Sequence, residues 1–301
     1  MAHILFICCG VIWGSNFAIM ADALALVGPL GLAVCRLGIG TVVFCLLWRW
    51  RKDPWPLARR DFLPLLGLAI FGFAAPFCIQ PHMIQIFAAK AGHGSSLVGL
   101  IMGLVPLATI VVSIPMLGVY PTQRQLFGVI GGFAALVYLF WGELAFGISV
   151  HSLVLASYTP ICYACSNVFV KRRFGHVPPA AWVMSVLGMS TVMVFPAALM
   201  LEDLKPVESV TWPICCIAII GVVSTGFVLL LFFKLIQGRG PLYAGMVSYL
   251  IPTVALVLGW ARGEKITGHQ VIALAIILVM VAITQIPERD RGGGNSMASD
   301  S

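Results

Sequence analysis

Apolar segments long enough to cross a bilayer follow one another along almost the whole chain, and this pattern limits what the chain can fold into. Of its 301 residues, 60% are hydrophobic and only 10% are charged, whereas roughly 25% are charged in an ordinary soluble domain. A water-soluble globule is therefore excluded, and no stretch remains for a separate soluble enzyme domain. The composition predicts a protein embedded in a lipid bilayer.

A hydropathy window of about 19 residues predicts ten membrane-spanning helices, and hence an all-α membrane protein. Glycine and proline mark most junctions, for example Gly28-Pro29 and Pro178-Pro179. No Lys or Arg precedes the first span, so we expect it to be retained rather than cleaved as a signal peptide. The expected spans are residues 3–26, 29–49, 62–87, 95–118, 122–141, 149–171, 178–201, 210–236, 240–262 and 267–286.

Basic residues are distributed unevenly over the two sides of this topology. Thirteen of the 18 Lys and Arg residues fall on one side and four on the other, while Arg36 lies inside a span. Since positively charged loops resist translocation, we expect the richer side, with both termini, to face the cytoplasm of a plasma (inner) membrane. This asymmetry accounts for the net charge of +7, so no nucleic-acid partner is expected.

The two halves of the chain repeat three landmarks in the same order. These are W-G-S-N-F at 13–17 and Y-A-C-S-N-V at 163–168, L-V-P at 104–106 and L-I-P at 250–252, and Pro29 and Pro178. Each half would hold five spans, an odd number, so the second half must enter the membrane from the opposite side. The sequence thus predicts two inverted five-helix repeats, at residues 1–142 and 143–286. The polar stretch 287–301 is expected to be a disordered cytoplasmic tail.

With these landmarks the chain resembles the EamA-type branch of the drug/metabolite transporter superfamily. The matching features are W-G-S-N at 13–16, Pro29 followed by Arg36, and S-Y-L-I-P at 248–252 followed by G-E-K at 263–265. The resemblance covers about residues 4–284 and implies export or exchange of amino acids and other small metabolites, with a binding cavity between the two halves. One departure is Gly118-Val119-Tyr120, where the family's first repeat usually has a Gly-Glu pair.

Polar side chains inside spans are candidate site residues, because burying them in a membrane is costly. Arg36 either orients a substrate carboxylate or phosphate, or fastens the first two spans by pairing with carbonyls and Asp22. The resemblance implies an Arg here whatever the substrate, which favours the structural role. Asn16 and Asn167 take matching places near the repeat axis, where transporters bind substrates. The alternative for both is a polar contact between helices.

Aromatic and polar neighbours extend this set. Trp13 and Tyr163 lie about one helical turn before the two amides and either offer rings to a substrate or pack against other helices. His82 follows Pro81 and shares a helical face with Gln85, so this pair either lines the cavity or forms an interhelical hydrogen bond. The expected substrate-binding residues are Trp13, Asn16, Arg36, His82, Gln85, Tyr163 and Asn167.

Catalytic and cofactor motifs cannot be recognised in the sequence. There is no Ser-His-Asp or Cys-His grouping and no phosphate-binding loop. The C-x-x-C at Cys162 and Cys165 has no second pair or histidine cluster nearby, and all nine cysteines fall within expected spans. We therefore expect no metal, no cofactor and no enzymatic activity.

The sequence favours an integral membrane transporter of small metabolites that works by alternating access, through export or facilitated diffusion. The alternative is a polytopic membrane enzyme acting on lipid-like substrates, which would need acidic clusters that the loops do not offer. The expected partners are a small-molecule substrate and the bilayer, and a homo-oligomer stays open as an alternative to a monomer. Since His82 is the only titratable candidate near the middle of a span, passive, gradient-driven movement is expected.

Overall fold

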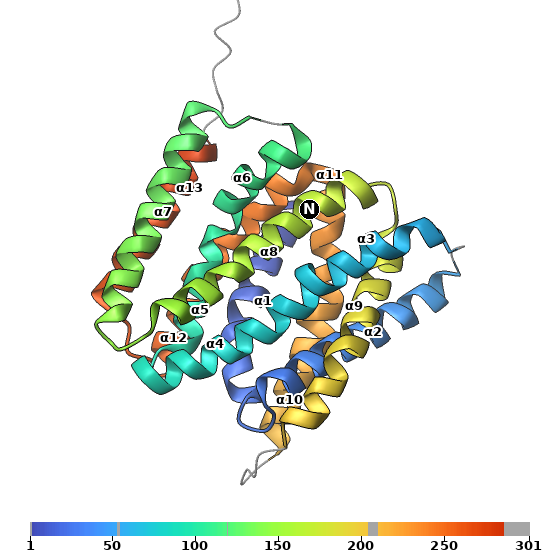
Figure 1. The fold of residues 1–301 in the computed structure, drawn as a ribbon, viewed down its shortest axis with the longest axis horizontal. Helices are drawn as coiled ribbons and strands as arrows, with labels where there is room; N and C mark the ends of the chain where they lie inside the picture. The colour runs from blue at the N-terminus through green and yellow to red at the C-terminus, as the bar shows by residue number, and fades with distance from the viewer. Residues whose placement is uncertain (1, 53–54, 119, 204–209, 286–301) are drawn as a thin grey trace, which may run out of the picture.

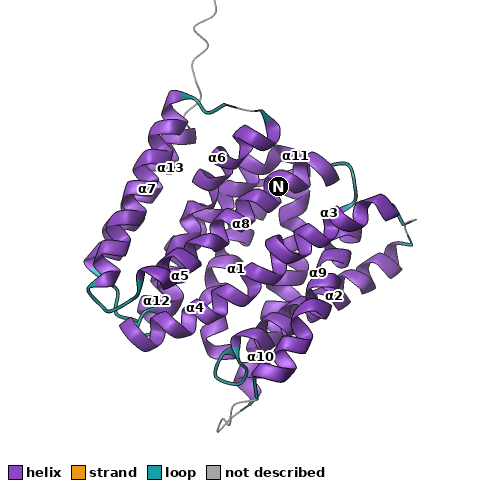
Figure 2. Cartoon of the chain, viewed as in Figure 1, coloured by secondary structure: helices purple, strands orange, loops and turns teal. Residues whose placement is uncertain are grey.

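The regular structure of the chain is helical throughout residues 2–52, 55–118, 120–203 and 210–285, the ranges that the computed structural model describes (Figure 1, Figure 2). Within these ranges, eight helical stretches are long and apolar enough to cross a membrane, and two shorter apolar helices cover Leu250–Ala261 and Gly268–Met280. The expected all-helical, multi-span fold is confirmed. The exact count of ten spans is not.

The first half contains five helical stretches, of which the third and fourth are each built from several segments. These elements are α1 (Ala2–Ala23), α2 (Pro29–Arg51), η1 (Arg59–Asp61), α3 (Phe62–Gly67), η2 (Leu68–Ala74), α4 (Ala75–Ala91), α5 (Gly94–Ile101), η3 (Met102–Leu104), α6 (Val105–Leu117) and α7 (Gln123–Leu144). Pro29 occupies the first helical position of α2, where a missing N–H costs nothing. Gly92 and Gly118 end α4 and α6 with φ of 73° and 68°, which suits glycine.

The second half repeats this plan. Its elements are α8 (Val150–Phe174), α9 (Pro179–Leu201), α10 (Thr211–Ile219), η4 (Ile220–Val228), α11 (Leu229–Gly245), η5 (Met246–Tyr249), α12 (Leu250–Ala261) and α13 (Gly268–Gln285). Each half has a π-helical segment in its third stretch, η2 or η4. Each half also has a 3₁₀ turn shortly before the landmark prolines Pro106 and Pro252. The repeat therefore extends to irregular backbone geometry, which in helices often marks functional positions.

The helix pairs that pack across the two halves are related by the repeat. Helix α2 packs along α9, and α7 packs along α13. Helix α1 packs against α12, as α8 packs against α6. In Figure 1 the α1–α2 connection lies at the lower edge of the molecule, whereas the α8–α9 connection lies at the opposite, upper right edge. Corresponding helices thus run in opposite directions, and the fold is an inverted repeat.

Close approach between these helices depends on glycines. A Cβ atom at Gly14 in α1 would overlap Val254 in α12, and one at Gly99 in α5 would overlap Ala255. Each glycine is part of a G-x-x-x-G spacing, Gly14 with Gly10 and Gly99 with Gly103, and this spacing favours close crossings of membrane helices. These glycines therefore serve helix packing rather than substrate binding.

Two boundaries differ from the expected topology. Helix α11 continues through residues 237–239, which separate the expected spans 210–236 and 240–262. Glycine is a weak helix former rather than a stop, and the membrane penalises unpaired backbone groups, so the helix persists. Helix α7 extends to Leu144, which places Glu143 in its last turn instead of in a loop. The expected disordered tail at 287–301 lies outside the described residues.

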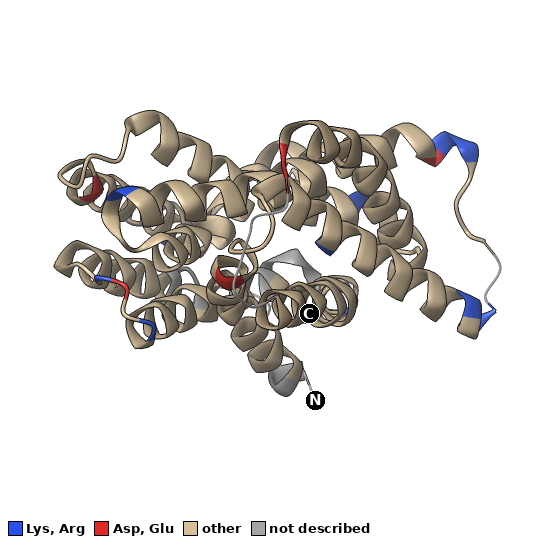
Figure 3. Ribbon diagram, turned by 90° about the horizontal axis from the view of Figure 1, so that it is seen from below, with Lys and Arg blue, Asp and Glu red and all other residues tan. Residues whose placement is uncertain are grey.

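Charged side chains gather near helix ends. Figure 3 shows the basic residues around the α2–α3 connection projecting at one end of the molecule. The basic end of α8, Lys171 to Arg173, belongs to the same edge, since the α2–α3 and α8–α9 connections lie on one side in Figure 1. This arrangement agrees with the basic asymmetry found in the sequence, and the side that faces the cytoplasm stays a prediction.

Candidate functional site

A central cavity lies between the two halves and encloses about 780 Å³ of space free of protein atoms, its mouth included. The first half contributes Trp13, Asn16, Phe17, Arg36, Gly72, Phe73, Phe77, Gln80, Met102 and Val105. The second half contributes Tyr163, Ser166, Asn167, Ser224, Thr225, Leu229, Phe232, Phe233, Ser248 and Ile251.

Aromatic rings form much of the cavity wall. The indole Nε1 of Trp13 donates a hydrogen bond to the backbone oxygen of Ser224 in η4, at 3.2 Å. The same indole meets Phe232 edge-on, with ring centroids 4.7 Å apart. These contacts hold a helix of the first half against the third stretch of the second half, so the wall is built across the repeat interface.

Arg36 lies about two turns after the start of α2, lines this cavity and is only 4% exposed. Its Nη1 donates to the sulfur of Met20 at 2.9 Å, and its Cζ lies 4.3 Å from the ring centroid of Phe77. Its Nε has no hydrogen-bond partner among the described atoms. A thioether is a weak acceptor, and an aromatic face carries no net charge, so neither contact neutralises the guanidinium.

The expected pairing of Arg36 with Asp22 is not formed. Asp22 instead makes an ion pair with Arg262 of the other half and accepts a hydrogen bond from the indole of Trp212 at 2.9 Å. Asp22 ends α1 near the membrane edge, whereas Arg36 lies within α2, which separates them along the bilayer normal. Asp22 is therefore not the partner that a structural role of Arg36 would need.

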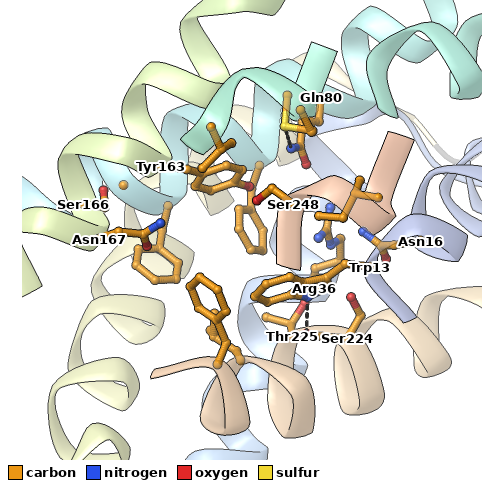
Figure 4. A pocket seen from close by; sticks show the side chains of 18 of the residues that line it. Trp13, Asn16, Arg36, Gln80, Tyr163, Ser166, Asn167, Ser224, Thr225 and Ser248 are labelled. Carbon is orange, nitrogen blue, oxygen red and sulfur yellow. Dashed lines mark hydrogen bonds between the residues drawn. The ribbon is translucent and has the colours of Figure 1, made fainter. Parts of the chain in front are cut away.

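Several polar groups of the cavity are buried without a partner. The Oδ1 of Asn16, the Oγ of Ser224 and the Oγ1 of Thr225 make no hydrogen bond to any described atom. Figure 4 shows these three residues with Trp13 and Arg36 on one side of the cavity, and Tyr163, Ser166 and Asn167 on the other. Unpaired polar groups are costly in an apolar interior, so their concentration here indicates a place for a ligand.

Five of the seven expected binding residues line the cavity, from Trp13, Asn16 and Arg36 in the first half to Tyr163 and Asn167 in the second. His82 and Gln85 do not, and this expectation is wrong. His82 is exposed on the outer surface of α4 and Gln85 is partly exposed. At about 100° per residue, the face carrying Phe73, Phe77 and Gln80 turns toward the cavity and turns His82 away.

Sequence reasoning missed the cavity residues on the third helical stretch of each half, among them Gln80 in the first half and Ser224 and Thr225 in the second. Phe73, Phe77 and Gln80 recur at the four- and three-residue spacing of one helical face, a pattern that the polar run at 80–85 obscured. Ser224 and Thr225 are a polar pair inside the long apolar run 213–236, and this was the available sign of a cavity-facing position.

A second buried polar cluster lies where α5, α7 and α13 meet. The Nε2 of His93 lies 2.6 Å from Glu143 Oε2, and Gln270 Nε2 donates to Glu143 Oε1 at 3.0 Å. All three residues are 0% exposed, and none of them lines the cavity. Each carboxylate oxygen of Glu143 therefore has a partner, whereas Nδ1 of His93 has none among the described atoms.

Comparison with known proteins decides the family. The model of the EamA-like transporter family matches residues 1–141 and again residues 151–285. The chain belongs to the EamA-like transporter family. As a member, it is a polytopic helical membrane protein of a transporter family, and the central cavity between its two family repeats is its candidate site.

A solved crystal structure of a protein resembles this EamA-like chain over nearly its full length. The two are 20% identical, with a TM-score of 0.69 over 94% of this chain and 97% of that chain. At this identity the likeness shows a shared fold alone. A search of curated proteins gives no match.

Proposed function

We propose that this protein carries small metabolites, amino acids or related compounds, across the plasma (inner) membrane by alternating access, through export or facilitated diffusion. One observation carries the proposal. A cavity with unpaired polar groups lies deep in the protein, and both halves of an inverted repeat supply its walls. In transporters built from inverted repeats, a site at the repeat interface can be reached from either side when the halves rock against each other.

Carboxylates tie the two halves together at one edge of the molecule. Glu202, which follows α9, accepts hydrogen bonds from the backbone N–H groups of Leu30 and Gly31 at 2.9 and 2.7 Å. Glu264, which follows α12, accepts from the N–H groups of Ser95 and Ser96 at 3.1 and 3.0 Å. A carboxylate at a helix N-terminus is favoured by the helix dipole. These contacts hold α2 and α5 against the second half at this edge.

Basic side chains make the corresponding ties at the opposite edge. Arg172 Nη1 donates to the carbonyl of Met116 at 2.7 Å, at the end of α6. Arg173 Nη2 lies 3.0 Å from the carboxylate of Asp61. These contacts are exposed and individually weak. An alternating-access cycle would release one set of ties while the other set holds.

Movement down a gradient is the proposed energetic mode. No Asp, Glu or His is among the described residues that line the cavity, so no group there would take up and release a proton during the cycle. His82, the one central candidate in the sequence, lies on the outer surface of α4.

Reconstitution into liposomes tests the proposal. Vesicles loaded with a mixture of labelled metabolites should release a subset of them unchanged when protein is present, and mass spectrometry of the released material identifies the subset. A side chain at Gly72 would collide with Ser166 in the cavity wall, so Gly72→Leu should abolish release, whereas Gly67→Leu, which has open space around it, should not. A chemically altered product would instead favour the membrane enzyme, and no release of any compound would refute transport.

Labelling tests the proposed orientation. In a cysteine-free background, Trp55→Cys and Gly175→Cys should resist membrane-impermeant thiol reagents added to intact cells, because both lie on the basic side. Lys90→Cys and Asp203→Cys lie on the other side and should react. Labelling of Trp55→Cys and Gly175→Cys in intact cells would show that the protein has the opposite orientation.

A further inference from the structure

Arg36 is a buried positive charge for which the described residues provide no negative partner. It is 4% exposed, its Nη1 donates to the thioether of Met20, and its Nε has no hydrogen-bond partner among the described atoms. Asp22, the acid nearest to it in the preceding helix, is engaged by Arg262 and Trp212. A buried charge in a membrane protein is costly unless something compensates it, so the free guanidinium points to an anion that is not part of the protein.

The surroundings of Arg36 limit what this anion can be. None of the described residues lining the cavity is acidic, and Arg36 is the only Lys or Arg among them. Most of the remaining wall is aromatic or aliphatic, including the edge-on pair of Trp13 and Phe232. The unpaired hydroxyls of Ser224 and Thr225 can donate to a second oxygen of the same anion.

We infer that the substrate is an organic monoanion, a carboxylate attached to an aromatic or apolar body, whose carboxylate pairs with Arg36. The inference rests on the transport function proposed above and narrows its substrate class. The planar guanidinium presents a fork of N–H donors that matches the two oxygens of a carboxylate. The aromatic wall receives the apolar body.

Charge balance separates this class from two others. A phosphate monoester carries close to two negative charges, and a single guanidinium would leave one of them unpaired in an apolar cavity. A zwitterionic amino acid brings an ammonium group that would lie near Arg36, where the described lining offers it neutral acceptors such as Asn16 Oδ1 but no acidic residue to balance its charge. A carboxylate without an ammonium group therefore fits better than a free amino acid.

A matched series of four ligands tests the inference on purified full-length protein. The probes are 3-phenylpropanoate, its neutral amide, 3-phenylpropylamine and phenylalanine, which share a phenyl body and differ in charge. Calorimetric titration should show that the protein binds the carboxylate at least ~30-fold more tightly than the amide, the loss expected when a buried charge pair is broken. The amine and phenylalanine should bind more weakly than the carboxylate.

Two variants test whether the preference for the carboxylate depends on Arg36. Arg36→Met removes the charge and the donors while keeping an unbranched side chain beside Phe77 and Met20, and it should abolish the preference for carboxylate over amide. Lys234→Met removes an exposed positive charge from α11 and should leave the preference unchanged. Equal binding of carboxylate and amide by the wild type, a preference that survives in Arg36→Met, or no binding of any probe at millimolar concentration would each overturn the inference.

Flux measurements keep this inference distinct from the transport proposal. In proteoliposomes, 2-phenylethanesulfonate is a permanent anion that does not leak across the bilayer as a neutral acid. Binding with the expected preference but no sulfonate flux would refute transport and leave the anion site intact. Flux of neutral or zwitterionic metabolites without any anion preference would support transport and overturn the anion site.

Discussion

Arg36 and Glu143 are both buried ionisable side chains, but their surroundings differ completely. Glu143 is 0% exposed and has a partner on each carboxylate oxygen, His93 at 2.6 Å and Gln270 at 3.0 Å. Arg36 is 4% exposed, lines the central cavity and has no anionic partner among the described residues. The protein therefore satisfies one buried charge internally and leaves the other available.

This difference distinguishes a structural charge from a binding charge. The Glu143 cluster joins the start of α5 to α7 and α13, two helices that pack along each other, and its three side chains are 0% exposed. Arg36 lies where the two halves meet around open space and where three other polar groups lack partners. Burial alone does not identify a functional residue, and neither does an unpaired atom, since Thr159 and Trp182 also have one outside the cavity. Arg36 is distinguished because it combines an unpaired charged group with a position on the cavity wall.

The largest effect is expected from removing the carboxylate of Glu143, both oxygens of which have partners. Glu143→Leu leaves Nε2 of His93 and the amide of Gln270 buried without an acceptor. The unfolding free energy should fall by about 3 to 5 kcal/mol, the usual cost of removing one partner of a buried charged pair. Denaturant unfolding in mixed micelles measures it. Asp203→Leu, which removes an exposed acid, serves as the control and should change stability little. A loss below about 1 kcal/mol for Glu143→Leu would mean that the cluster is not structural.

A double-mutant cycle sharpens this result. If His93 and Glu143 act as one unit, the destabilisation from His93→Ala and Glu143→Ala together should be smaller than the sum of the two single losses, by about 0.5 to 3 kcal/mol. The comparison uses unfolding free energies measured under one set of conditions. Additive losses would show that the 2.6 Å contact carries no coupling energy.

A smaller effect on stability, with a large effect on transport, is expected at the cavity amides. Asn16→Ala and Asn167→Ala should each change the unfolding free energy by less than about 1 kcal/mol, since the Oδ1 of Asn16 has no partner to lose. Each should slow substrate flux in proteoliposomes by about tenfold, the equivalent of one lost hydrogen bond to the ligand. If both lower stability and leave flux per folded protein unchanged, these amides only join helices.

The architecture could be predicted because its determinants are local in the sequence. Apolar length, proline and glycine at helix ends and the echo of Ser-Asn around residues 15–16 and 166–167 indicate the spans and the repeat. The same echo placed Asn16 and Asn167 in one cavity. Inversion followed from counting spans in each half.

The errors concern helix rotation and long-range partners, which local patterns do not determine. His82 and Gln80 are two residues apart, yet only Gln80 faces the cavity, because the packing of α4 against α2, α5 and α8 sets its rotation. Glu143 lay outside the expected span 122–141, and its contacts could not be foreseen because its partners His93 and Gln270 are 50 and 127 residues away. The π-helical geometry of η2 and η4 was likewise invisible in the sequence.

The apo stability of Arg36→Met tests the central claim most directly, that this charge is kept for a ligand rather than for the fold. Removing a buried charge that has no anionic partner should leave the unfolding free energy of the ligand-free protein unchanged or higher, while carboxylate binding is lost. A fall of about 3 kcal/mol or more, comparable to that of Glu143→Leu, would show that Arg36 is a structural charge and would contradict the account.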